Sequence, residues 1–143
     1  MIGLDTNVLA RYFAQDDAAQ ARAATEIIES FSDDVPGFIS ATVLVELTWV
    51  LERCYHLQKA ELVRILDNLL KSREIIIENA PLAHQALRLY AQCNAGFADC
   101  LIERSGAAAG CEFTFTFDQD AAAALAGMTE IDSQKITGKR HEN

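Results

Sequence analysis

Apolar and polar residues follow one another along this chain in short blocks whose period changes repeatedly. Short apolar runs bounded by Gly, Pro, Asn or Asp alternate with longer stretches whose apolar residues recur at helical spacing. The short runs predict strands at residues 1–5, 38–39, 74–78, 113–117 and 128–131, of which 74–78 is expected to be buried. Strands that alternate with helices favour an α/β fold with a mainly parallel central sheet of four to five short strands.

The helical spacing predicts helices at residues 6–13, 16–31, 41–55, 58–72, 81–93, 97–110 and 119–126. Ser40 is a good N-cap for the third of these helices. Apolar side chains cover almost the whole circumference of that helix, and Glu46 interrupts them. Because a helix that is apolar all round is enclosed on several sides, Glu46 is expected to lie in or beside the core.

The composition indicates one globular domain. The chain has 143 residues, of which 50% are hydrophobic and 23% charged. We expect residues 1–131 to form the domain and residues 132–143 a polar tail. No apolar run approaches the roughly 20 residues of a membrane span, and the N-terminus lacks the basic region of a secretory signal.

The four cysteines form no CxxC pair and stand in apolar surroundings. They are expected to be small buried hydrophobes in a reducing compartment, which predicts a cytoplasmic protein.

The net charge is −9 at pH 7. A protein that held nucleic acid by neutralising phosphates alone should be basic. Either nucleic acid is not the partner, or bound cations reverse the sign of the charge at the site.

Four acids do not fit a solvated helix face. Asp5 ends an apolar strand, Glu46 interrupts an apolar helix, Asp99 lies inside an apolar helix start, and Asp118 ends the strand at 113–117. Carboxylates are almost never fully buried unless they are paired or bind a metal. Three of the four fall at strand ends or helix starts, which a parallel sheet places along one edge.

Converging carboxylates need a counter-charge. Each pair would repel by about 4 kcal/mol at ~4 Å and an effective dielectric near 20. A divalent cation resolves this conflict, and ligands made only of oxygen suit Mg²⁺ or Mn²⁺. The alternative for Asp5, Asp99 and Asp118 is that each caps its helix or favours the helix dipole, whereas Glu46 lies mid-helix and caps nothing.

The same acids lie in four motifs that follow one another along the chain. They are IGLDTNVL at residues 2–9, ISATVLVEL at 39–47, FADCLI at 97–102 and TFD at 116–118. In order and approximate spacing they resemble the PIN domain, in particular the VapC-type toxins of prokaryotic toxin–antitoxin pairs. The resemblance covers the chain from residue 2 to about 131.

The resemblance implies a three-layer α/β/α domain and an Mg²⁺- or Mn²⁺-dependent endoribonuclease. By the family pattern Asp5, Glu46 and Asp99 bind metal, and Asp118 is the fourth acid of the pocket. The residues implied or expected beside these acids are Thr6, Asn7 and Thr116. Such a site would activate a bound water for in-line attack on phosphorus, and by resemblance would leave a 5′-phosphate and a 3′-hydroxyl.

The resemblance also implies partners. We expect an RNA substrate, a small VapB-like antitoxin and a homodimer, with DNA bound only through the antitoxin and no membrane. Two positions depart from the family pattern. Gly96 stands where some relatives carry a further acid, so the number of metal ions, one or two, and a role for Asp120 in the site stay open. Ala121 stands where an aromatic residue is frequent.

Two other functions match parts of the sequence. The segment Asp118-Gln119-Asp120 resembles the nucleophile loop of haloacid-dehalogenase-type phosphatases, but those enzymes place it near the N-terminus and only 23 residues follow Asp120 here. A non-catalytic PIN-like module that acts by binding an antitoxin-like partner stays open, although the presence of all four acids speaks against it.

Overall fold

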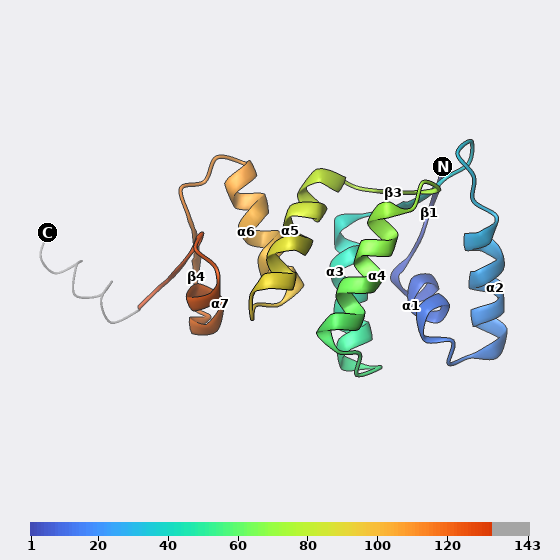
Figure 1. The fold of residues 1–143 in the computed structure, drawn as a ribbon, viewed down its shortest axis with the longest axis horizontal. Helices are drawn as coiled ribbons and strands as arrows, with labels where there is room; N and C mark the ends of the chain where they lie inside the picture. Colours follow the sequence, from blue (N-terminus) through green and yellow to red (C-terminus); the bar gives the residue numbers. More distant parts are fainter. Residues whose placement is uncertain (133–143) are drawn as a thin grey trace, which may run out of the picture.

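The computed structural model describes residues 1–132, and the predicted tail at 132–143 lies outside this range except for its first residue. The described helices are α1 (Thr6–Ala14), α2 (Ala18–Glu29), α3 (Ala41–Arg53), α4 (Lys59–Lys71), α5 (Ala80–Gln92), α6 (Phe97–Ala108) and α7 (Gln119–Ala124). The described strands are β1 (Ile2–Gly3), β2 (Gly37–Ile39), β3 (Ile75–Ile77), β4 (Thr114–Thr116) and β5 (Met128–Glu130). Their order along the chain is drawn in Figure 1.

All strand pairs are parallel, and they form two sheets. β1, β2 and β3 make one sheet in that spatial order, and β4 pairs with β5 in a second sheet. The predicted α/β class with parallel strands is therefore confirmed, with the difference that the strands do not join into one central sheet. Helices α5 and α6, and then α3 and α4, lie between β4 and the first sheet along the long axis of the molecule (Figure 1).

Polar side chains fix where the helices begin. The side chain of Ser40 accepts a hydrogen bond from the Val43 amide at 3.2 Å, which confirms the predicted cap of α3. Asp17 caps α2 in the same way by accepting from the Gln20 amide. At the other end of α6 the chain turns at Gly110 with φ +93°, a backbone conformation that glycine adopts without steric cost.

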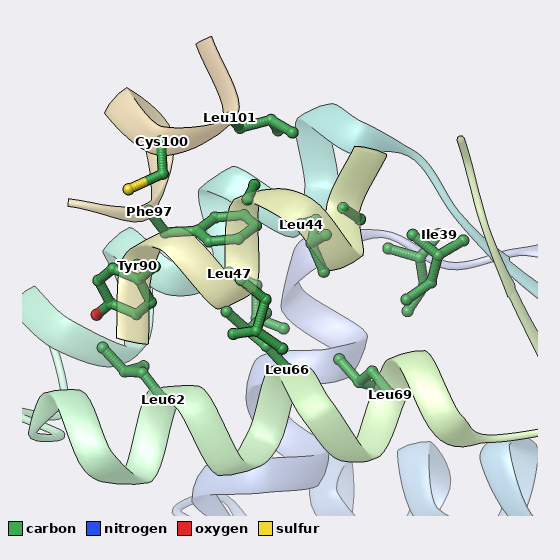
Figure 2. Packing of buried hydrophobic residues seen from close by; sticks show 14 of the residues in the cluster. Ile39, Leu44, Leu47, Leu62, Leu66, Leu69, Tyr90, Phe97, Cys100 and Leu101 are labelled. Carbon is green, nitrogen blue, oxygen red and sulfur yellow. The ribbon is translucent and has the colours of Figure 1, made fainter. Parts of the chain in front are cut away.

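Leucines from α3 and α4 form the centre of the core (Figure 2). Leu44, Leu47 and Leu51 of α3 and Leu62 and Leu66 of α4 are each at most 1% exposed. Tyr90 of α5 and Phe97 of α6 close the cluster with an edge-to-face ring contact of 5.9 Å between centroids. Burial of one such leucine contributes roughly 1.5–3 kcal/mol to folding, so this cluster holds four helices together.

Two expectations about burial are wrong. The strand at 74–78 is buried only in part, because Ile77 faces the core while Ile76 points to the opposite face and is 45% exposed. Of the four cysteines, which are all free thiols, Cys100 is buried, but Cys54 and Cys111 are exposed. Among the described helices none is long and apolar enough to cross a membrane.

Candidate functional site

Asp5 lies at the junction of β1 and α1 and begins the helix. Its Oδ1 accepts a hydrogen bond from the Thr6 amide at 2.8 Å, and its backbone is extended, as an N-cap requires. The side chain is exposed. A carboxylate has two oxygens and several acceptor positions, so one capping bond leaves Asp5 able to bind a cation.

Thr6 connects this junction to helix α3. The residue is 5% exposed, and its hydroxyl donates to Oε2 of Glu46 at 2.7 Å, although 40 residues separate the two in sequence. The structure therefore brings the start of α1 and the second turn of α3 together. The predicted site, which includes Asp5 and Glu46, requires these two elements to be neighbours.

Glu46 lies on an open side of α3, and the prediction that α3 is enclosed on several sides is wrong. Leu44, Leu47 and Leu51 face the core, while Glu46 is exposed and Trp49 is 47% exposed. An apolar circumference did not imply burial here, because the neighbouring elements leave a groove open beside this part of the helix.

A groove of about 510 Å³ runs beside Glu46 between α3 and α6. Its walls are mostly apolar, and it is lined by Ala41, Thr42, Val45, Glu46, Trp49, Ala98, Leu101, Ile102 and Ser105. The neighbours of Asp99 on α6 therefore face the same groove as Glu46.

Asp99 stands in the first turn of α6 and is half-buried. Burial raises the pKa of its carboxyl group, and the negative charge of Asp118 raises it further. A cation bound beside Asp99 would lower the cost of ionising this carboxyl group.

Asp118 repeats the arrangement of Asp5 at the end of β4. Its Oδ1 accepts from the Ala121 amide at 3.0 Å and caps α7, and its own amide donates to Oγ1 of Thr116 at 3.0 Å. Thr116 therefore holds the backbone of Asp118 rather than its carboxylate.

The predicted site residues thus form two groups in the structure. Thr6 links Asp5 to Glu46, and Asp118 lies near enough to Asp99 to raise its pKa. Within residues 1–132, no three His, Cys, Asp or Glu side chains lie close enough together to hold one metal ion. The donors are all carboxylates, and this donor chemistry fits Mg²⁺ or Mn²⁺; their role as ligands stays a prediction.

The two remaining candidates lie at the margin. Asn7 is exposed and lines a separate pocket between α1 and α2, with Ile27 on the opposite wall. Asp120 is exposed in the first turn of α7, a position where an acid is favoured by the helix dipole whatever its other role.

Glu103 is a buried acid that the sequence pattern did not single out. It is 3% exposed, and both of its carboxylate oxygens accept from the guanidinium of Arg104, whose pKa is raised by this contact. Its position four residues after Asp99, on the same face of α6, was the available signal. The side chain also lies against Gly127, where an added Cβ would collide with the carboxylate.

Comparison with known proteins identifies the family. The family model of the PIN domain matches residues 2–126. The chain belongs to the PIN domain family. The predicted PIN-like fold is thereby confirmed, and the four acids singled out from the sequence all lie within the matched range.

Among curated proteins this PIN domain is similar to the VapC ribonuclease of Aquifex aeolicus (strain VF5). The two are 25% identical over 103 residues, which are 68% of this chain and 73% of the relative. Among solved structures it matches VapC20 of Mycobacterium tuberculosis, a sarcin–ricin loop cleaving toxin. That match has a TM-score of 0.44 and 24% identity and covers 92% of this chain and 98% of the other.

Proposed function

We propose that this PIN-domain protein is an Mg²⁺- or Mn²⁺-dependent endoribonuclease and the cytoplasmic toxin of a toxin–antitoxin pair. The observation that carries the proposal is the similarity to the VapC ribonuclease, which extends over about three quarters of that protein. The four carboxylates within the matched family range supply the chemistry that such an enzyme needs.

The metal would be held by Asp5, Glu46, Asp99 and Asp118. When bound, the cation would offset the repulsion among these carboxylates and stabilise the negative charge that develops on the phosphoryl group. The acids must be ionised to bind it, so the raised pKa of Asp99 means that binding weakens at a higher pH than for an ordinary aspartate.

Two hydroxyls position these acids. The Thr6 hydroxyl donates to Oε2 of Glu46 and so orients that carboxylate, as outer partners of metal ligands do in other proteins. The Thr116 hydroxyl accepts from the amide of Asp118 and holds the turn on which this acid stands.

The partners follow from the charge. The chain carries a net charge of −9, so RNA would approach it only where bound cations reverse the local sign. The same charge suits a basic antitoxin, which we propose as the protein partner, since complementary charge speeds association and favours the right complex.

The test compares cleavage of RNA by the wild type and by Asp5→Asn, with Mg²⁺ or Mn²⁺ and after chelation. Asparagine is as good an N-cap as aspartate, so the variant should keep α1 while losing the charge. Asp17→Asn is the matched control, because Asp17 also caps a helix with a side-chain acceptor but lies beyond the end of α1 opposite to Asp5.

We expect the wild type and Asp17→Asn to cleave RNA only with metal, and Asp5→Asn to lose at least 100-fold, about 2.7 kcal/mol of transition-state stabilisation. Equal cleavage by all three proteins after chelation would sink the metal-carboxylate mechanism. Absence of cleavage together with no Mn²⁺ uptake in calorimetry would instead favour the non-catalytic binding module.

A further inference from the structure

The sheet β1-β2-β3 ends at β1 in an open strand edge. The amides of Ile2 and Leu4 donate at 2.9 Å to carbonyl oxygens of the β2 segment, those of Pro36 and Phe38. The peptide groups of Gly3 therefore point to the other edge of β1, where no strand pairs within residues 1–132.

The sheet β4-β5 has a similar open edge at β4, with an uncovered apolar face beside it. The Thr114 amide donates to the Gly127 carbonyl at 2.8 Å, so the peptide groups of Phe115 point away from β5. Phe113, Phe115 and Phe117 share one face of the strand and are 43%, 58% and 71% exposed. An open, apolar strand edge is a template for pairing with another strand.

The two other outer strands are protected by charge. Glu74 and Glu78 flank β3, and Glu130 belongs to β5. Charged residues oppose pairing at an edge, and acids on both strands would also repel each other. β1 and β4 contain no charged residue, so they are the pair that fits.

The β4-β5 sheet is fixed to helix α6. Glu103 of α6 is buried against Gly127 in the turn before β5, and Gly106 of α6 lies so near Thr114 that an added Cβ would be 2.7 Å from its Oγ1. A strand attached in this way moves only together with its helix.

Helix α6 is in turn packed on α5, through Phe97 against Tyr90 in the core (Figure 2). Figure 1 shows α5 and α3 between β4 and β1 along the molecule. To reach β1 of its own chain, β4 would have to pull α6 away from α5 and expose these buried rings. A second copy can bring its β4 to this edge without such a loss.

We propose that two copies of this chain exchange strands, so that β4 of each pairs in parallel with β1 of the other. Aligning the acid that follows each strand places Asp118 beside the partner's Asp5. The consequence is that Asp118 from the second copy completes each metal site, and this consequence rests on the proposed function.

A disulfide tests the pairing without any assay of cleavage. Ile2 and Phe115 each lie three residues before their acid and are 49% and 58% exposed. Paired strands run about 4.8 Å apart, within the range of a disulfide. The variant Ile2→Cys/Phe115→Cys is made with Cys54→Ser and Cys111→Ser, which remove the exposed thiols. Ile76→Cys/Phe115→Cys, on β3 instead of β1, is the matched control.

After mild oxidation, a non-reducing gel should show a covalent dimer for the first variant and none for the control. A monomer with an internal disulfide would mean that β4 closes on β1 of its own chain and would overturn the proposal. The absence of any new disulfide, or equal dimer in the control, would overturn it as well.

Complementation tests the shared site. Asp5→Asn and Asp118→Asn chains, each inactive alone, are co-expressed with different tags. Random pairing in a two-fold dimer makes half of the dimers mixed, with one intact site of two, so total activity should recover to about a quarter of the wild type. No recovery, while the wild type cleaves RNA, would overturn the shared site. An inactive wild type would contradict the proposed function and leave the disulfide result to decide the strand exchange.

Discussion

The two sheets of this protein are built by the same local rule and end in different surroundings. In both, a parallel strand is followed by an aspartate that caps the next helix, Asp5 after β1 and Asp118 after β4. Yet Ile39 in β2 of the first sheet is fully buried, whereas Phe115 in β4 of the second sheet is 58% exposed. The local sequence determines the strand, the turn and the cap, but what covers a strand depends on elements far along the chain.

The carboxylates show the same contrast. Glu46 accepts from the Thr6 hydroxyl and lies at an apolar groove, while burial, and after it the charge of Asp118, raises the pKa of Asp99. The carboxylate of Glu46 is oriented by a hydrogen bond, whereas ionisation of Asp99 is opposed by burial and by a like charge. Replacement of Thr6 should therefore disturb Glu46, because its carboxylate loses a hydrogen-bond donor. Removal of the charge of Asp99 should instead stabilise the metal-free protein.

The largest difference between the two regions is expected in their cores. Leu47→Ala, in the α3–α4 cluster with no exposed surface, should lower the free energy of unfolding by roughly 2–5 kcal/mol. Leu125 is 1% exposed in the region formed by β4, α7 and β5, and Leu125→Ala should mainly open that region. Hydrogen exchange should then show faster exchange in β4 and β5 with α4 still protected. If both variants reduce the protection of α4 equally, the two regions do not open separately.

Removal of the Thr6 hydroxyl probes the first group of acids. Thr6→Val should reduce Mn²⁺ affinity in calorimetry by about 10–100-fold, because Glu46 loses the donor that orients it. Thr48→Val is the control, since Thr48 is 3% exposed on α3 and its hydroxyl donates to the Val45 carbonyl instead. If both variants weaken Mn²⁺ binding equally, Thr6 has no special role at Glu46.

The joint between the regions can be tested at Gly127. Gly127→Ala places a Cβ against the buried carboxylate of Glu103 and should cost about 1–3 kcal/mol of unfolding free energy, as overpacking does. Gly3→Ala meets no atom within 4 Å and, as an exposed change, should alter stability by about 0.5 kcal/mol or less. Denaturant unfolding measures both, and an unaffected Gly127→Ala would mean that Glu103 moves aside freely.

The smallest effect, and the one with a distinctive sign, concerns Asp99. Its folded-state pKa is raised, so ionisation destabilises the metal-free fold at pH values above that pKa and costs nothing below its ordinary value near 3.8. Asp99→Asn should therefore raise Tm in the presence of a chelator at pH 7, and this gain should vanish as the pH falls below about 4. Asp120→Asn, at an exposed aspartate, serves as the control. A lower Tm of Asp99→Asn at pH 7 would contradict the conclusion that ionised Asp99 destabilises the metal-free fold.

Much of the fold could be predicted from the sequence because caps and apolar periodicity act locally. Helix α3 begins after Ser40 as expected, and β4 lies within the predicted strand at 113–117. The open side of α3 at Trp49 and the exposed Ile76 were not predictable in this way. Each depends on which element packs against which, and the division into two sheets is of the same kind.

The candidate site divides along the same line. The sequence singled out the four acids by their positions next to strand ends and inside apolar stretches, and the capping roles of Asp5 and Asp118 followed from those positions. The contact between Thr6 and Glu46 joins residues 40 positions apart, and no local pattern indicates such a pair. The packing of α1 on α3 brings these two side chains together.

The capping bonds of Asp5 and Asp118 also limit how such a protein can change over generations. Loss of either side-chain oxygen would fray a helix and would also remove one of the proposed metal ligands. A lineage that abandons cleavage but still needs the folded surface would therefore keep a capping residue at both positions. Asparagine, one nucleotide away from aspartate in the genetic code, is the substitution that silences the chemistry and spares the fold.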